Sequence, residues 1–160
     1  MKKTLFLLIS HSLAIIIGFS LGIFALPILT APDAPKQHLL SEAVTQSLFV
    51  ANFSKDRQGS DFLHQGEGKV SIGHEVIAFE GKLSPGPDFK LYLSPIFIET
   101  KEDFLKQKSK MVKVGDVKTF NNFIVPVPKD IDPIKYNTVI IWCETFQQYI
   151  TSASYSLVDE

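Results

Sequence analysis

The chain has 160 residues, of which 16 are basic and 17 acidic, so its formal net charge at pH 7 is −1. A near-neutral chain is a poor binder of polyanions, so the composition argues against a nucleic-acid partner. Cys143 is the only cysteine, which excludes a disulfide within the chain.

The first 30 residues differ in composition from the rest of the chain. Residues 4–29 contain no Asp, Glu, Lys or Arg. A spanning helix needs about 20 predominantly apolar residues, whereas the apolar region of a cleavable signal is usually about 7–15 residues long. Pro32 directly after Ala31 makes a poor exit for signal peptidase. The sequence therefore predicts an uncleaved signal anchor over residues 1–30, with a cleaved signal as the alternative.

Lys2 and Lys3 predict the orientation of this span. Positive residues beside a span tend to stay on the cytoplasmic side, so the N-terminus is expected in the cytoplasm and the C-terminal domain outside it. Without these two lysines the exported part has 14 basic and 17 acidic residues, a net charge of −3 with histidines neutral. Gly18 and Gly22 lie four residues apart, which lets a second helix approach closely, so a homodimer through this pair is a candidate assembly.

Residues 31–48 are predicted to link the span to the domain. Pro32 and Pro35 favour an extended spacer, and apolar residues from Leu39 to Leu48 recur at helical spacing. We expect a short helix here. Its closeness to the membrane favours a linker role over a contribution to the core.

Residues 49–160 form the predicted domain. Short alternating runs are separated by Gly and Pro, and Gly73–His74 resembles a hairpin turn. The run 139–146 is almost wholly apolar and is expected at the centre of a sheet. The predicted strands are residues 69–72, 75–80, 89–94, 120–127, 139–146 and 148–157.

Helix signals within this domain are few. Thr100 can cap a helix over residues 100–108, and Asp132 before Pro133 favours a single turn. Closely spaced strands with turn signals between them favour an antiparallel sandwich or barrel. The predicted fold class is therefore all-β, a single antiparallel β-sandwich or barrel-like domain preceded by an N-terminal transmembrane helix.

Four local motifs, in this order, resemble the DM-thirteen family of small extracytoplasmic "electron transfer" domains, often found beside DOMON domains. The resemblance covers roughly Phe49–Ser156. The motifs occupy Gly66–Val70, Gly86–Ser94, Val114–Lys118 and Tyr136–Phe146.

The resemblance implies an exported all-β module that takes part in redox chemistry through the cysteine after the tryptophan, here Cys143. A single thiol on an exported domain makes redox exchange with another membrane-bound redox protein the working hypothesis. Two departures from the family pattern are visible. Thr119–Pro126 stands in place of a glycine-rich approach to a strand, and the acidic Glu144 follows the cysteine, which bears on the chemistry.

Strand alternation predicts the environment of Cys143. It places Val139, Ile141 and Cys143 on one face and Glu144 on the other. Because an unpaired carboxylate is costly to bury, the Cys143 face is expected to be the core face. An apolar core raises the pKa of a thiol, and no second cysteine can resolve an oxidised one. Two functions stay open: a redox accessory with Cys143 as candidate catalytic group, and a non-catalytic ligand- or protein-binding domain with a structural cysteine.

Other residues that could form a functional site give weaker indications of one. His64 and His74, with Met111 or Cys143, lack the spacing of a metal-ligand set, so no metal site is predicted and no cofactor is assigned. Asp88 follows a proline turn and is a candidate for orienting a ligand. No hydrolytic or transferase motif is recognisable, so any enzymatic role is limited to redox assistance.

Overall fold

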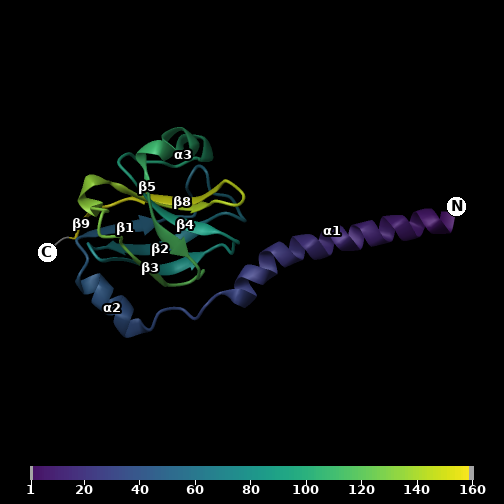
Figure 1. The fold of residues 1–160 in the computed structure, drawn as a ribbon, viewed down its shortest axis with the longest axis horizontal. Coiled ribbons are helices and arrows are strands. Elements are labelled where there is room, and N and C mark those ends of the chain that lie inside the picture. Colours follow the sequence, from purple (N-terminus) through teal and green to yellow (C-terminus); the bar gives the residue numbers. More distant parts are fainter. Residues whose placement is uncertain (1, 159–160) are drawn as a thin grey trace.

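The computed structural model describes residues 2–158 and begins with one long helix. Helix α1, Lys2–Thr30, extends away from the rest of the protein, and none of its residues is buried (Figure 1). It is long and apolar enough to cross a membrane, although a signal sequence would meet the same criterion. Pro27 lies within this helix, which continues to Thr30.

The remainder is a sandwich of two antiparallel sheets. The five-stranded sheet has the order β6-β3-β2-β1-β9 and the four-stranded sheet the order β5-β4-β7-β8. The sandwich alternative of the prediction is confirmed, because the two sheets are separate and do not close into a barrel. The strands of the first sheet are β1 Phe49–Phe53, β2 Gly66–Ile72, β3 Val76–Leu83, β6 Phe123–Pro126 and β9 Ser156–Leu157. Those of the second are β4 Phe89–Ser94, β5 Val112–Val117, β7 Thr138–Cys143 and β8 Gln148–Ser154.

The predicted strand 89–94 coincides with β4, and the other five predicted strands differ from the observed ones in their bounds. The hairpin at Gly73 forms, with Ile72 paired to Ile77. Strand β7 lies inside its sheet with all six residues buried, but it ends at Cys143 because residues 144–147 make a tight turn. The single strand predicted over 148–157 is wrong, since the chain leaves β8 at Ser154 and β9 joins the other sheet beside β1.

The main core lies between the sheets. A second core lies on the outer face of the four-stranded sheet, under helix α3, Lys101–Gln107. Thr100 caps this helix as predicted, its side chain accepting a hydrogen bond from the Asp103 amide at 3.1 Å. Phe104 of α3 stacks on Trp142 of β7 with ring centroids 3.9 Å apart. Strand β7 is therefore apolar on both faces because a different core covers each face.

Helix α2, Gln37–Thr45, packs on the outer face of the five-stranded sheet. Leu40 and Ala43 are buried in a small cluster with Ala78 of β3. The expectation that this helix serves only as a linker therefore needs correction. The small side chain of Ala78 leaves room on the sheet for Leu40, and this complementarity is not visible in the helical segment alone.

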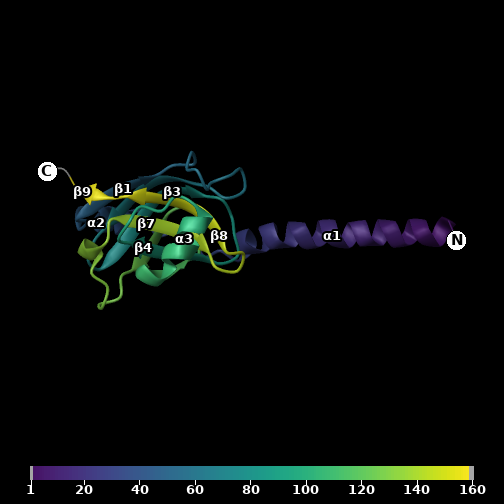
Figure 2. The same cartoon turned by 90° about the horizontal axis from the view of Figure 1, so that it is seen from above.

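Four connections lie together at one end of the sandwich, which we call the loop end. Residues of these connections share pockets with the C-terminal part of α1. Figures 1 and 2 both show β9 at the opposite end of the domain, away from α1. The loop end consists of residues 61–65, 84–88, 118–122 and 144–147, whereas residues 57–60 of the β1–β2 connection lie beside β8.

Candidate functional site

Cys143 is the last residue of β7 and lies at the loop end. It pairs with Phe89 of β4 on one side and with Gln148 of β8 on the other. Its exposed fraction is 2%, and it packs in the main core with Val139 and Ile141. The face predicted from strand alternation is therefore the core face, as the sequence indicated.

This environment keeps the sulfur protonated at neutral pH. Burial raises the pKa of the Cys143 thiol, because an apolar surrounding disfavours the thiolate, and backbone hydrogen bonds at Phe146 and Asp88 offset only part of this effect. The thiolate is the nucleophile in thiol chemistry. A buried thiol held in its protonated form is less reactive than an exposed one.

A small pocket adjoins Cys143. It measures about 40 Å³, roughly the space of a single water molecule. His64, Pro87 and Phe146 of the loop end line it, together with Phe24 of α1. An imidazole and aromatic rings, rather than aliphatic groups alone, therefore separate Cys143 from the outside of the domain.

His64 is held in place by Asp61. Its Nδ1 lies 2.9 Å from each of the two carboxylate oxygens. Burial opposes ionisation of Asp61, but the hydrogen bonds from His64 and from the Leu63 amide lower its pKa overall. His64 is therefore partly buried, and a carboxylate orients it at the pocket of Cys143.

The other residues considered from the sequence lie elsewhere. His74 occupies the turn between β2 and β3, at the far end of the sandwich, and Met111 packs against the second core under α3. Neither is brought to Cys143. Within residues 2–158, no group of three or more His, Cys, Asp or Glu side chains is placed to hold a metal ion.

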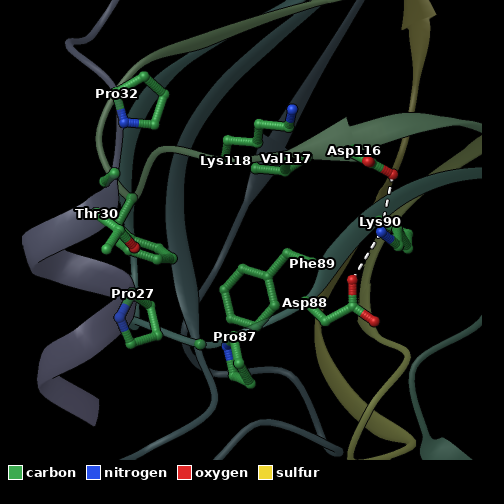
Figure 3. A pocket seen from close by; sticks show the side chains of 13 residues that line it. Pro27, Thr30, Pro32, Pro87, Asp88, Phe89, Lys90, Asp116, Val117 and Lys118 are labelled. Carbon is green, nitrogen blue, oxygen red and sulfur yellow. Dashed lines mark hydrogen bonds and ion pairs between the residues drawn. The ribbon is translucent and has the colours of Figure 1, made fainter. Parts of the chain in front are cut away.

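Asp88 fixes the turn that follows Cys143. It accepts a hydrogen bond from the Thr145 hydroxyl at 3.1 Å, and its carbonyl accepts one from the Glu144 amide at 3.0 Å. Lys90 Nζ lies 2.7 Å from Asp88 Oδ1 and 2.8 Å from Asp116 Oδ1 (Figure 3). The hydrogen bonds from Lys90 hold the pKa of both carboxyl groups below the ordinary value. These structural contacts occupy the Asp88 side chain and explain its position without a bound ligand.

Glu144 points away from Cys143, onto the face under α3. Its carboxylate accepts hydrogen bonds from the Tyr92 hydroxyl and from Lys108 Nζ, the latter at 2.8 and 3.0 Å. Burial opposes ionisation of Glu144, but these two partners lower its pKa overall. Although Glu144 follows the cysteine in sequence, it is committed to Lys108 and Tyr92 and cannot serve as a base for the thiol.

Sequence reasoning missed the pocket and most of its lining. The pocket combines a helix outside the domain, a loop after β1 and a turn after β7, so no local motif marks it. The strand topology gives one indication of this pocket. In an antiparallel sandwich the β1–β2 and β7–β8 connections lie at the same end, which brings His64 toward Cys143.

The fold and this site define a small β-sandwich module with one cysteine at a strand end, joined to an apolar helix. The chain belongs to the family described as Electron transfer DM13, whose family model matches residues 53–155. This confirms the resemblance to the DM-thirteen family. No curated protein and no solved structure matches the chain.

Proposed function

We propose that this protein is a membrane-anchored extracytoplasmic module with a redox accessory role, and that Cys143 is its reacting group. The observation that carries this proposal is membership of an electron transfer family. Cys143 is the only thiol in the chain, so any thiol chemistry must use it. Helix α1 serves as the anchor, with Lys2 and Lys3 on the cytoplasmic side.

The chemistry available to one thiol is exchange with a disulfide of a membrane-bound redox protein. The Cys143 sulfur attacks one sulfur of that disulfide, and the bond between the two partner sulfurs breaks. The released partner sulfur takes up the proton that Cys143 loses. Attack by this freed thiol on the mixed disulfide only reverses the exchange. For net transfer, a dithiol of a second redox protein attacks the partner sulfur of the mixed disulfide and releases Cys143 as the thiol, and its second thiol completes reduction of the partner as the donor itself becomes a disulfide.

The raised pKa and the packing of Cys143 make this exchange conditional on local opening. The turn 144–147 is the element that must move, because Phe146 lines the pocket and the turn continues directly from Cys143. Short turns open at lower free energy than core strands do. A docked partner that displaces Phe146 would supply the access that the isolated domain lacks.

The burial of Cys143 favours a second candidate, a non-catalytic binding domain. In this role the sulfur only fills space in the core, and the connections at the loop end contact a ligand or protein. The chain would still be a member of the same family. The two candidates differ in one property, which is whether Cys143 reacts while the domain is folded.

Thiol trapping on the folded, full-length protein tests the proposal. We expect an alkylating reagent to modify Cys143 slowly, yet faster than the protein unfolds globally, with a Cys143→Ser variant as the unlabelled control. Modification that occurs only at the rate of global unfolding would exclude the redox role. A Cys143→Ser variant with unchanged spectra would then assign the protein to the second candidate.

A further inference from the structure

The length of α1 fixes the depth of the loop end, given the anchoring proposed above. A helix rises about 1.5 Å per residue, so the roughly 30 Å of bilayer hydrocarbon takes about 20 residues. Counted from Thr4, directly after the two lysines, the hydrocarbon therefore ends near Ile23. The remaining two turns of α1, up to Thr30, lie in the outer headgroup region.

The loop end of the sandwich contacts this part of α1. Ile23 and Phe24 line the same pocket as Cys143. A second pocket, of about 250 Å³, lies between Pro27 of α1 and Pro87 of the β3–β4 connection (Figure 3). These shared pockets place the loop end at the depth of the headgroups, and not at a distance from the bilayer.

Apolar side chains at the loop end face outward. Phe62 is 89% exposed and Phe146 is 49% exposed, and Leu63 next to Phe62 is exposed as well. The far end also carries exposed apolar residues such as Ile134 and Leu157, so exposure alone does not identify a membrane contact. The two ends differ in their distance from α1. Phenylalanine and leucine at headgroup depth are typical of surfaces that rest in the interface.

Two lysines beside α1 complement the charge of lipid phosphates. Lys118 lines the pocket next to Pro27, and Lys82 lines a neighbouring pocket next to Pro32. Among the residues that the structure describes, neither lysine forms an ion pair, whereas Lys90 nearby is paired with two carboxylates (Figure 3). A basic residue close to an anionic membrane surface contributes about 1 kcal/mol to binding.

We propose that the loop end rests on the outer leaflet of a phospholipid bilayer. Phe62, Leu63 and Phe146 lie at the boundary between headgroups and acyl chains, and Lys82 and Lys118 meet lipid phosphates. The pocket of Cys143 then opens toward the lipid interface instead of bulk water. A partner of the proposed exchange must accordingly approach in the plane of the membrane. This inference rests on the anchoring of the proposed function.

Site-directed spin labelling of the full chain tests the inference. Cysteines are introduced singly at Phe62, Phe146, Ile134 and Ile15 in a Cys143→Ala background. The labelled proteins are reconstituted in vesicles of phosphatidylcholine and phosphatidylglycerol. Collision of each label with oxygen, which concentrates in lipid, is compared with collision with a water-soluble nickel chelate.

We expect a several-fold higher ratio of oxygen to nickel collisions at Phe62 and Phe146 than at Ile134, the matched exposed position at the far end. Ratios at Phe62 and Phe146 equal to that at Ile134 would overturn the inference, and so would shielding of both from both reagents, which means that protein covers them. The label at Ile15 tests the anchoring by α1 separately from the contact of the loop end. A high oxygen-to-nickel ratio at Ile15 with low ratios at Phe62 and Phe146 would refute the contact and leave the anchoring intact. A low ratio at Ile15 would refute the anchoring itself.

Discussion

Truncation of Phe146 to alanine should open the path to Cys143. Phe146 is 49% exposed, so it makes about half of the contact of a fully buried phenylalanine. Truncation of a buried phenylalanine costs about 3–5 kcal/mol, and half of that is about 2 kcal/mol. If this contact closes the pocket, the opening free energy falls by about the same amount. Because about 1.4 kcal/mol corresponds to a tenfold change, alkylation of Cys143 should become at least about tenfold faster.

The assay must separate local opening from global unfolding, because Phe146→Ala also lowers overall stability. Phe104→Ala serves as the matched control. Phe104 is fully buried in the second core, on the opposite side of the four-stranded sheet from Cys143. Its truncation should cost more stability than that of Phe146 without changing the pocket. Phe62→Ala is a second control, since Phe62 lies at the same end but is almost wholly exposed.

We expect Phe146→Ala alone to accelerate alkylation, measured by mass spectrometry under native conditions. If Phe104→Ala accelerates it as much or more, Cys143 reacts only through global unfolding, and the role given to the turn 144–147 is refuted. An unchanged rate in Phe146→Ala would show equally well that Phe146 does not guard the sulfur.

Three further outcomes are expected. Phe104→Ala should lower the free energy of unfolding by about 3–5 kcal/mol in urea titrations, and a loss well under 1 kcal/mol would contradict its place in the second core. Glu144 has a lowered pKa in the folded protein, so its stabilising contribution is present above its unfolded value and disappears as the pH falls through the folded value. Glu144→Gln should therefore reduce the stability gained between about pH 3 and pH 7, and an unchanged gain would show that the pair with Lys108 contributes nothing. Gly18→Ile and Gly22→Ile should weaken any homodimer in crosslinking experiments while leaving the domain folded, because a Cβ at either position meets open space; equal crosslinking of both variants and the natural chain would exclude a dimer through this pair.

The position of Cys143 could be predicted from the sequence because it depends on local alternation. The cost of burying Glu144 selected the core face, and the structure places Val139 and Ile141 on that face with the cysteine. The cap at Thr100 and the hairpin at Gly73 were equally local. Each of these features depends on side chains within a few residues of one another.

Features that depend on distant segments were not predictable in this way. Strand β1 follows directly from a segment with helical spacing, and its partner β2 begins 13 residues after it ends, at Gly66. Strand β9 changes sheets because Leu157 pairs with Phe49. Leu40 is buried against Ala78 of β3, a residue distant in the sequence. The pocket at Cys143 required both the topology and the approach of α1.

The most direct test of the central claim is disulfide exchange at Cys143 in the folded, full-length protein in detergent solution, where no bilayer covers the loop end. The protein is incubated with glutathione disulfide, and the mixed disulfide is quantified by mass spectrometry beside unfolding rates measured under the same conditions. We expect Cys143 to acquire glutathione and to release it to added dithiol, at rates above that of unfolding. A sulfur that stays unmodified until the domain unfolds would contradict the redox role and leave Cys143 as a structural core residue.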